Sequence, residues 1–238
     1  QRQMCIRDRA YLTATLTESF HQTTERIFEK ASLLLTTQDF TTALLYIETA
    51  VTILEEVDAF IELGQQLTKI SLILIQAEQI KDAENYAKRA VEALLKKKDL
   101  QEAGKTEQTI GKAFLTAQLF SQGATHIIES AKQFKQSKHL EGIEEAKDLL
   151  LKTAKSKFQE GNLDLAKELI AKAALCGTQK DSLTEAKTLV DFATFIHEKG
   201  DPALAHSYYS DALKALGTTN LEKTKEIIQQ MVTIAKKL

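Results

Sequence analysis

One spacing pattern recurs five times along this chain and constrains its fold more than any other feature. Each copy has a small residue, an apolar residue four positions later, and a second small residue after three more positions. The first members lie 40, 40, 43 and 39 residues apart, and the small pairs are Ala43 and Ala50, Ala83 and Ala90, Gly123 and Ser130, Ala166 and Ala173, and Ala205 and Ala212. A nearly fixed period of this length is typical of helical repeat arrays, in which each repeat stacks on its neighbours.

The composition favours an all-α fold and narrows the possible functions. The 238 residues include one proline, nine glycines and no tryptophan, and residues that favour helices are abundant. A formal net charge of −2 gives no support to nucleic-acid binding. The two cysteines, Cys5 and Cys176, are too few for a disulfide framework and lack metal-ligand spacing, which favours a reducing, cytoplasmic location. No apolar run approaches the length of a transmembrane segment.

Helical periodicity and turn signals predict five helical hairpins followed by one capping helix. The small residues are expected where the two helices of a hairpin approach closely, because longer side chains would hold them apart. We therefore predict a right-handed α-α superhelix with repeats over about 18–58, 59–99, 100–139, 140–180 and 181–218, and a cap over 221–238. No linker rich in proline, glycine or serine interrupts residues 18–238, so we expect a single domain there.

Short polar residues and glycines predict where individual helices begin and end. Side chains that can cap a helix N-terminus precede several helical stretches, at Asp39, Ser121, Asn162 and Asp201. Gly161 and Gly200 follow helical stretches and predict helix ends.

The N-terminal residues carry a different signal. Residues 4–9 read Met-Cys-Ile-Arg-Asp-Arg, a string that resembles the translation of sequencing-adapter read-through. A frayed natural tail is the alternative. We expect residues 1–9 to lie outside the fold and residues 1–17 to be disordered or artefactual.

The layout of the repeats resembles the tetratricopeptide repeat (TPR), which pairs a small residue in helix A with an Ala…apolar…Ala set in helix B. The most similar strings are Gly-Asn-Leu-Asp-Leu-Ala at 161–166 and Gly-Asp-Pro-Ala-Leu-Ala at 200–205. The resemblance covers about residues 18–238 and implies a TPR-like solenoid. Two features differ from the pattern of that family. The period exceeds the usual value of about 34 residues, and helix A lacks its early aromatic residue.

Residue types that support catalysis or metal binding do not gather into a recognised motif. The one Glu-x-x-His, from Glu18 to His21, lacks the second pair that a helical di-iron site needs. His126 occupies a slot that holds tyrosine or leucine in the other repeats, which indicates a packing role. Cys176 ends an apolar helix, where a buried and inert thiol is expected. We therefore predict no enzymatic activity, no cofactor and no metal.

The TPR resemblance also implies which residues would bind a partner, because the A helices of TPR arrays line the concave surface. The corresponding positions in this chain are found by counting back fixed numbers of residues from the first small residue of each repeat. Polar side chains, mostly lysines, occupy these positions at Gln65, Lys69, Lys105, Gln108, Lys112, Lys152 and Lys155. A basic stripe in a nearly neutral protein would suit an acidic peptide or helix, and an ordinary solvated face is the alternative.

The function implied by the resemblance is that of a non-catalytic scaffold or adaptor. Such a protein would hold a peptide or helical segment of another protein in its concave groove. A narrower alternative is an adaptor similar to the SNAP family of the membrane-fusion machinery, which uses long-helix TPR-like hairpins and a basic face, although no motif specific to that family occurs. A third interpretation is the regulatory repeat arm of a larger enzyme or signalling protein. Oligomeric state stays open.

Overall fold

The structure, a computed structural model, describes the backbone of residues 2–177, 182–217 and 221–235. Side chains are described from residue 19 onward within these ranges, apart from those of residues 184, 221, 223, 230, 234 and 235. All secondary structure in the described ranges is α-helical, which confirms the predicted all-α class. The helices are α1 (Arg2–Thr36), α2 (Phe40–Glu56), α3 (Phe60–Gln76), α4 (Ile80–Lys96), α5 (Leu100–Thr116), α6 (Phe120–Gln136), α7 (Leu140–Gln159), α8 (Leu163–Leu175), α9 (Ser182–Glu198), α10 (Pro202–Leu216) and α11 (Leu221–Ala235).

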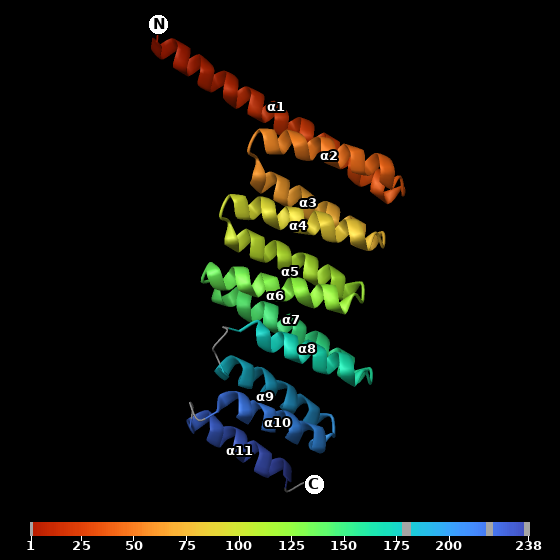
Figure 1. Cartoon of the computed structure of the whole chain (residues 1–238), viewed down its shortest axis with the longest axis vertical. Coiled ribbons are helices and arrows are strands. Elements are labelled where there is room, and N and C mark those ends of the chain that lie inside the picture. The colour runs from red at the N-terminus through yellow and green to blue at the C-terminus, as the bar shows by residue number, and fades with distance from the viewer. Residues whose placement is uncertain (1, 178–181, 218–220, 236–238) are drawn as a thin grey trace. The chain divides into compact units, whose positions relative to one another are not determined.

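The chain divides into two compact units, with the boundary inside α5. Unit 1 covers residues 1–106 and unit 2 covers residues 107–238. Consecutive helices pack as pairs inside each unit, α1 with α2 and α3 with α4 in unit 1, and α7 with α8 and α9 with α10 in unit 2 (Figure 1). This pairing confirms a helical repeat fold, whereas the number of hairpins, the superhelical hand and the single domain over 18–238 stay predictions.

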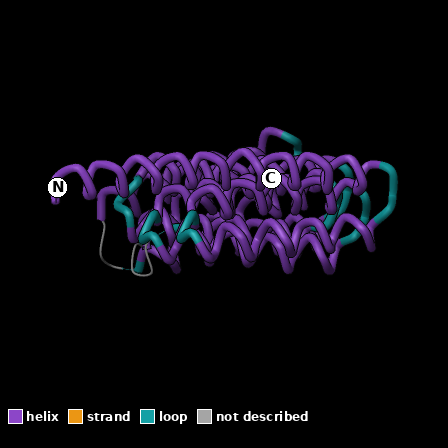
Figure 2. Tube along the Cα trace, turned by 90° about the horizontal axis from the view of Figure 1, so that it is seen from above, coloured by secondary structure: helices purple, strands orange, loops and turns teal. Residues whose placement is uncertain are grey.

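The turns between helices follow a period that the sequence pattern did not reveal. From α1 to α7, each turn contains a residue with a left-handed backbone, and these recur every 20 residues at Gln38, Asp58, Glu78, Lys98, Gln118 and Lys138. The next residue donates its N–H to a carbonyl five positions earlier, as from Asp39 to Leu34 (2.9 Å), which closes a Schellman motif. Figure 2 shows these turns at the ends of the helices. The structural repeat is therefore one helix and one turn, half of the predicted period, because turns within and between hairpins are alike.

The recurring small residues lie in the interior, where paired helices approach closely. All ten are buried. In unit 1, the Ser71 hydroxyl on α3 donates a hydrogen bond to the Ala83 carbonyl on α4 at 2.9 Å. In unit 2, a Cβ on Gly111 would come within 2.9 Å of the Gly123 carbonyl oxygen on α6. Small side chains at these positions therefore permit backbone contact between paired helices.

The helix caps match most of the predicted positions. Asp39, Asn162 and Asp201 each accept a hydrogen bond from the backbone N–H three residues later, which confirms them as N-caps. The predicted cap at Ser121 is wrong, because α6 begins at Phe120 and its N-cap residue makes no side-chain hydrogen bond. An unpredicted cap occurs at His139, whose Nδ1 accepts from the Gly142 N–H at 2.9 Å.

The first helix differs from its predicted extent. α1 begins at Arg2, so the backbone is helical over residues 2–17, where we expected disorder. The side chains of this stretch lie outside the described residues, and the adapter-derived origin of residues 1–9 stays a prediction. None of the helices that the structure describes combines the length and apolarity needed to cross a membrane.

Candidate binding site

The lysines predicted to face a partner lie on the surface of their own units. In unit 1, Gln65, Lys69 and Lys105 are exposed, and Lys105 Nζ lies 3.7 Å from a carboxylate oxygen of Glu102. The structure therefore places these side chains in solvent, where a partner could reach them, while pairing one of them with a neighbour on its own helix.

In unit 2, the predicted residues lie on a face shared by α5, α7 and α9. Lys112 and Lys152 are exposed, whereas Gln108 and Lys155 are half-buried. Two contacts join this face across helices. Gln108 Nε2 donates to Glu145 on α7 at 3.4 Å, and Lys155 Nζ lies 5.4 Å from the centroid of the Phe195 ring on α9. This face thus carries lysines together with one carboxylate and an aromatic ring.

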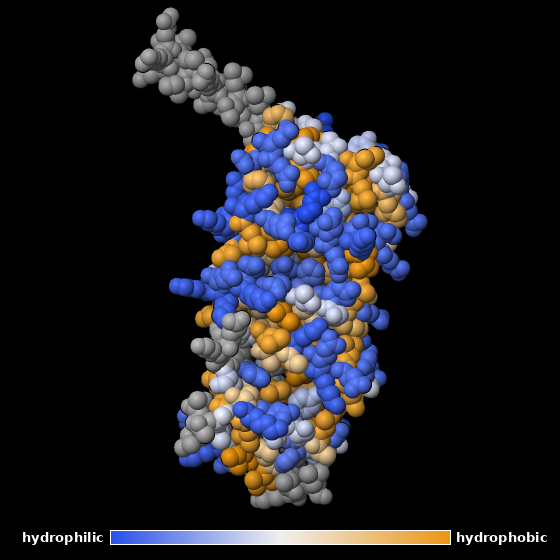
Figure 3. All heavy atoms as spheres, in the orientation of Figure 1, coloured by the Kyte–Doolittle hydropathy of each residue, from blue (hydrophilic) through white to orange (hydrophobic). Residues whose placement is uncertain are grey.

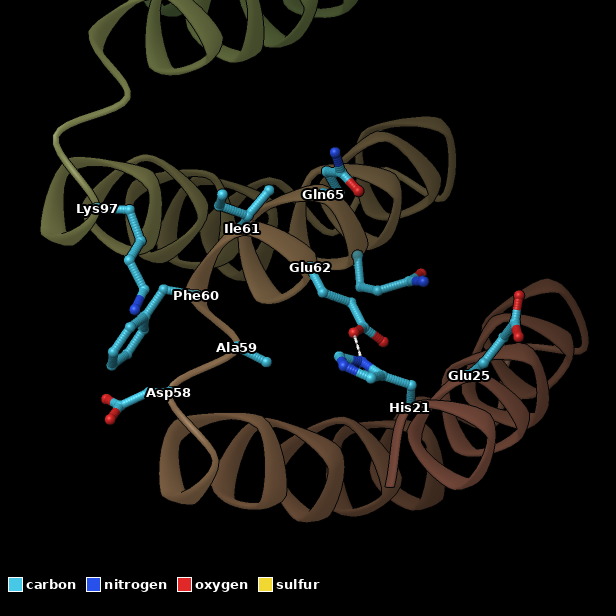
Figure 4. Close-up of a pocket in the computed structure, with 10 residues that line it drawn as sticks. His21, Glu25, Asp58, Ala59, Phe60, Ile61, Glu62, Gln65 and Lys97 are labelled. Atoms are coloured by element: carbon cyan, nitrogen blue, oxygen red, sulfur yellow. Dashed lines mark hydrogen bonds and ion pairs between the residues drawn. The ribbon is translucent and has the colours of Figure 1, made fainter. Parts of the chain in front are cut away.

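Unit 1 contains an open pocket between α1 and α3, which we call the α1–α3 pocket (Figure 4). Its volume is about 530 Å³. The lining comes from α1, the α2–α3 turn, the first turns of α3 and the end of α4, and comprises His21, Glu25, Asp58, Ala59, Phe60, Ile61, Glu62, Gln65, Gln66 and Lys97. Gln65 is the one predicted partner-binding residue in this set.

The polar groups of the α1–α3 pocket are partly paired with one another. Nδ1 of His21 contacts a carboxylate oxygen of Glu62, and Figure 4 shows the two side chains pointing toward each other. The Thr24 hydroxyl also donates to Glu62, at 3.4 Å. These contacts tie α1 to α3 at the wall of the pocket.

The apolar part of the same pocket comes from the start of α3. The Phe60 ring lies under the ammonium groups of Lys96 and Lys97, at 4.4 and 5.5 Å from its centroid. Ile61 remains 45% exposed. The pocket therefore offers an accessible aliphatic surface beside carboxamide and carboxylate groups.

Sequence reasoning missed most of this pocket, although a signal was present. The notable pattern is an aromatic or aliphatic residue directly after each turn, at Phe40, Phe60, Ile80, Leu100, Phe120 and Leu140. The member of this pattern that opens α3, Phe60, lies at the pocket, and Ile61 follows it directly.

A cluster of Glu48, Tyr86 and Arg89 joins α2 to α4 in unit 1. Arg89 donates to both carboxylate oxygens of Glu48, at 2.5 and 3.0 Å, and the Tyr86 hydroxyl donates at 2.8 Å. The Arg89 hydrogen bonds lower the pKa of Glu48, and burial raises the pKa of Tyr86. The cluster is internally satisfied, so we assign it a structural role.

His126 and Cys176 were considered above as candidate functional residues, and both side chains lie inside unit 2. His126 Nδ1 lies 2.5 Å from a carboxylate oxygen of the buried Glu107, and its ring stacks on Phe114 at 5.2 Å. Cys176 is 2% exposed, and burial raises its thiol pKa to about 12. A thiol held protonated in this way is a poor nucleophile at neutral pH. In the described residues, no group of three His, Cys, Asp or Glu side chains could hold a metal ion.

Hydrophilic and hydrophobic side chains are interspersed on the visible face of each unit (Figure 3). Together, the paired helices and evenly spaced turns define a tandem helical repeat protein. Protein-family models give no match to the chain, and a search of the curated proteins finds no significant match.

Among solved structures, the chain is similar to one described as "Circular tandem repeat protein with novel repeat topology and enhanced subunit contact surfaces". That similarity has a TM-score of 0.40 and 13% identity, and covers 90% of this chain and 59% of the other. The chain thus spans less than two thirds of that structure's length. It is also similar to a chain described as "DHF119 filament", with a TM-score of 0.25 and 16% identity over 92% of this chain and 95% of the other.

Proposed function

We propose that this protein is a non-catalytic scaffold that binds a peptide or helical segment of another protein. The observation that carries the proposal is the α1–α3 pocket, because it combines an accessible aliphatic side chain with hydrogen-bonding groups on one open surface. Ile61 offers apolar contact area, and the carboxamides of Gln65 and Gln66 offer donors and acceptors that suit a peptide backbone. Repeat proteins present extended surfaces of this kind to protein partners.

The charges around the pocket suggest the character of the partner. Three carboxylates, those of Glu25, Asp58 and Glu62, line it with the single ammonium group of Lys97 and the imidazole of His21. Lys69 follows Gln65 by about one helical turn on the exposed side of α3. The proposed partner segment therefore places a basic residue at the pocket and an acidic residue near Lys69.

In unit 2, the proposed contacts are those on the shared face of α5, α7 and α9. Lys112 and Lys152 are exposed there, and Gln108 contacts Glu145. A partner with both acidic and basic residues suits this face as well, since it carries ammonium groups together with the carboxylate of Glu145.

Peptide selection followed by a matched pair of variants tests the proposal. A random-peptide library is selected on the full chain, and the affinities of the selected peptides are measured by fluorescence anisotropy. Ile61→Asp changes a residue that lines the pocket, whereas Leu45→Asp changes a more exposed aliphatic residue, at 67% exposure, on α2 outside the pocket. We expect Ile61→Asp to weaken binding about tenfold and Leu45→Asp to leave it unchanged.

Equal affinities for the two variants would place the peptide elsewhere and overturn the assignment of this pocket. Failure to select any binding peptide would overturn the scaffold proposal itself.

A further inference from the structure

One surface of α2 in unit 1 carries no charge, and we call it the α2 face. Leu45 is its most exposed large residue, at 67% exposure. The uncharged residues that lie side by side there, at helical spacing, are Thr41, Thr42, Leu45, Tyr46, Thr49, Thr52 and Ile53. None of them lines the α1–α3 pocket, so an inference from this face does not depend on the proposed scaffold function.

The same repeat positions are polar or charged in α4, which sets the α2 face apart. Forty residues further along the chain, α4 exposes Lys81, Asn85 and Glu92. Solvent-facing positions of this repeat therefore accept charged side chains. Because most of Leu45 lies in solvent, its packing inside the chain does not account for an aliphatic residue there. A contact with another molecule does.

The threonines make the α2 face less polar than their residue type suggests. The Thr49 hydroxyl donates a hydrogen bond to the Leu45 carbonyl at 2.8 Å, and the Thr52 hydroxyl donates to the Glu48 carbonyl at 2.9 Å. These hydroxyl groups are satisfied within their own helix. A neighbouring molecule can therefore cover them without leaving a hydroxyl unpaired, and their methyl groups extend the apolar surface of Leu45.

Tyr46 indicates what kind of structure covers such a surface. Its counterpart in α4, Tyr86, is 3% exposed and donates its hydroxyl to Glu48 on α2 at 2.8 Å. A helix of this same protein thus covers the tyrosine in α4. Tyr46 is 39% exposed, and its hydroxyl makes no hydrogen bond within the part of the chain that the structure describes. The repeat position that contacts a helix in α4 therefore has none against it in α2.

The charges of α2 favour a second copy of this chain as the occupant. α2 contains three charged residues, all glutamates. Arg89 pairs with Glu48, and Lys96 Nζ lies 4.0 Å from a carboxylate oxygen of Glu55, so two of the three are matched within unit 1. A strongly acidic or basic partner would find no opposite charge on the α2 face. The α2 of a second copy presents the same uncharged surface and meets no repulsion.

We propose that the α2 face is the interface of a homodimer, in which α2 packs antiparallel against α2 of a second copy about a two-fold axis. Two-fold dimers are the commonest homo-oligomers, and each uses one surface that is complementary to itself. Antiparallel packing keeps the two Glu56 carboxylates at opposite ends of the interface, whereas parallel packing would bring them together. The Tyr46 hydroxyl of each copy gains a facing helix, as Tyr86 already has.

The size of the α2 face sets the expected strength of the dimer. α2 has 17 residues, and a single pair of helices of that length buries less than the roughly 1,600 Å² of a standard protein interface. We therefore expect weak self-association, with a Kd on the order of 0.1 mM. The measurement must cover concentrations on both sides of that value.

Sedimentation equilibrium of the full chain tests the proposal. We expect the average mass to rise with concentration from 26.6 kDa toward twice that value. Leu45→Lys places ammonium groups from both copies in the interface, and we expect it to raise the Kd at least about tenfold. Asn85→Lys adds the same charge at the same repeat position of α4, outside the α2 face, and should leave the Kd unchanged. Circular dichroism establishes that both variants remain helical.

A mixture of oppositely charged variants tests the two-fold axis itself. Leu45 lies within one helical turn of the middle of the α2 face, so its two copies lie near each other in the proposed dimer. We expect Leu45→Glu alone to be as weakly associated as Leu45→Lys alone. An equal mixture of the two should recover dimer, because the opposite charges then face each other across the axis. A mixture of Leu45→Lys with Asn85→Glu should not.

Each contrary result bears on a different part of the proposal. A protein that stays monomeric over the whole concentration range would overturn the dimer. Undiminished association of Leu45→Lys would place the interface elsewhere, and equal weakening by Asn85→Lys would trace the effect to net charge, so either result would overturn the assignment of the α2 face. Failure of the mixed Leu45 variants to associate would show that α2 meets a different surface of its partner and would overturn the two-fold packing.

Discussion

Unit 1 keeps a strict repeat from α2 to α4, whereas unit 2 departs from it. In unit 1, α2, α3 and α4 each contain 17 residues and each buries an apolar residue at the ninth position after a left-handed turn residue. In unit 2, α7 lengthens to 20 residues and α8 shortens to 13, and the corresponding positions include two charged residues, Glu107 and Lys147.

The difference shows at which inward positions this fold accepts a residue that does not contribute to packing. A regular helix and turn fill the interior with small and aliphatic side chains, and every inward position then serves packing. A charged residue at such a position must be matched locally, as His126 matches Glu107. Lys147 is likewise paired with Glu144 on its own helix. In unit 2, where helix lengths vary, charged side chains therefore lie in the interior. In unit 1, the corresponding inward positions hold apolar residues.

Breaking the Glu107–His126 pair should have the largest effect on this comparison. His126→Leu leaves a carboxylate unpaired in the interior, and we expect it to lower the free energy of unfolding by about 3 kcal/mol. The double variant Glu107→Leu with His126→Leu restores apolar packing of the kind seen at Leu67, so most of that loss should be recovered. Urea denaturation followed by circular dichroism measures both. A double variant no more stable than the single one would refute the matching argument.

Overpacking a close helix contact in unit 1 should have the next largest effect. Ala83 is fully buried, and its carbonyl accepts the hydrogen bond from Ser71, so added bulk would push α4 away from α3. We expect Ala83→Leu to cost about 1–3 kcal/mol, measured by thermal and urea unfolding. Asn85→Leu, on the exposed side of the same helix, is the control and should change stability little. An unchanged melting temperature for Ala83→Leu would contradict the assigned contact.

The helical repeat could be predicted from the sequence because small residues at fixed spacing report directly on close helix packing. Ala43, Ala83 and Ala166 are informative for this reason, since backbone approach excludes larger side chains. The 20-residue turn period was hidden because its central residues, such as Gln38 and Lys98, are ordinary polar residues whose left-handed conformation leaves no compositional trace.

The candidate binding site was less accessible to sequence reasoning. Gln65 was predicted because it lies at a fixed offset along one helix, but the α1–α3 pocket also needs His21 and Lys97, which come from other helices. The burial of Lys147 was hidden for a similar reason, because it depends on which helices pack around that position. Sequence periodicity identifies helix faces, whereas pockets arise where several helices meet.

The turns offer the smallest and most selective test of the comparison between units. Lys98 in unit 1 holds a left-handed φ of 58°, which costs an L-residue with a Cβ more than it costs glycine. We expect Lys98→Gly to stabilise the protein by about 0.5 kcal/mol, because relief of that strain exceeds the added flexibility of the unfolded chain. In unit 2, Gly161 already has φ 82°, and a Cβ there would meet no atom within 4 Å. Gly161→Ala should therefore cost about 1 kcal/mol through the backbone alone, so the two substitutions should shift the urea midpoint in opposite directions. A destabilised Lys98→Gly would mean that its side chain, rather than the turn conformation, stabilises that end of α4.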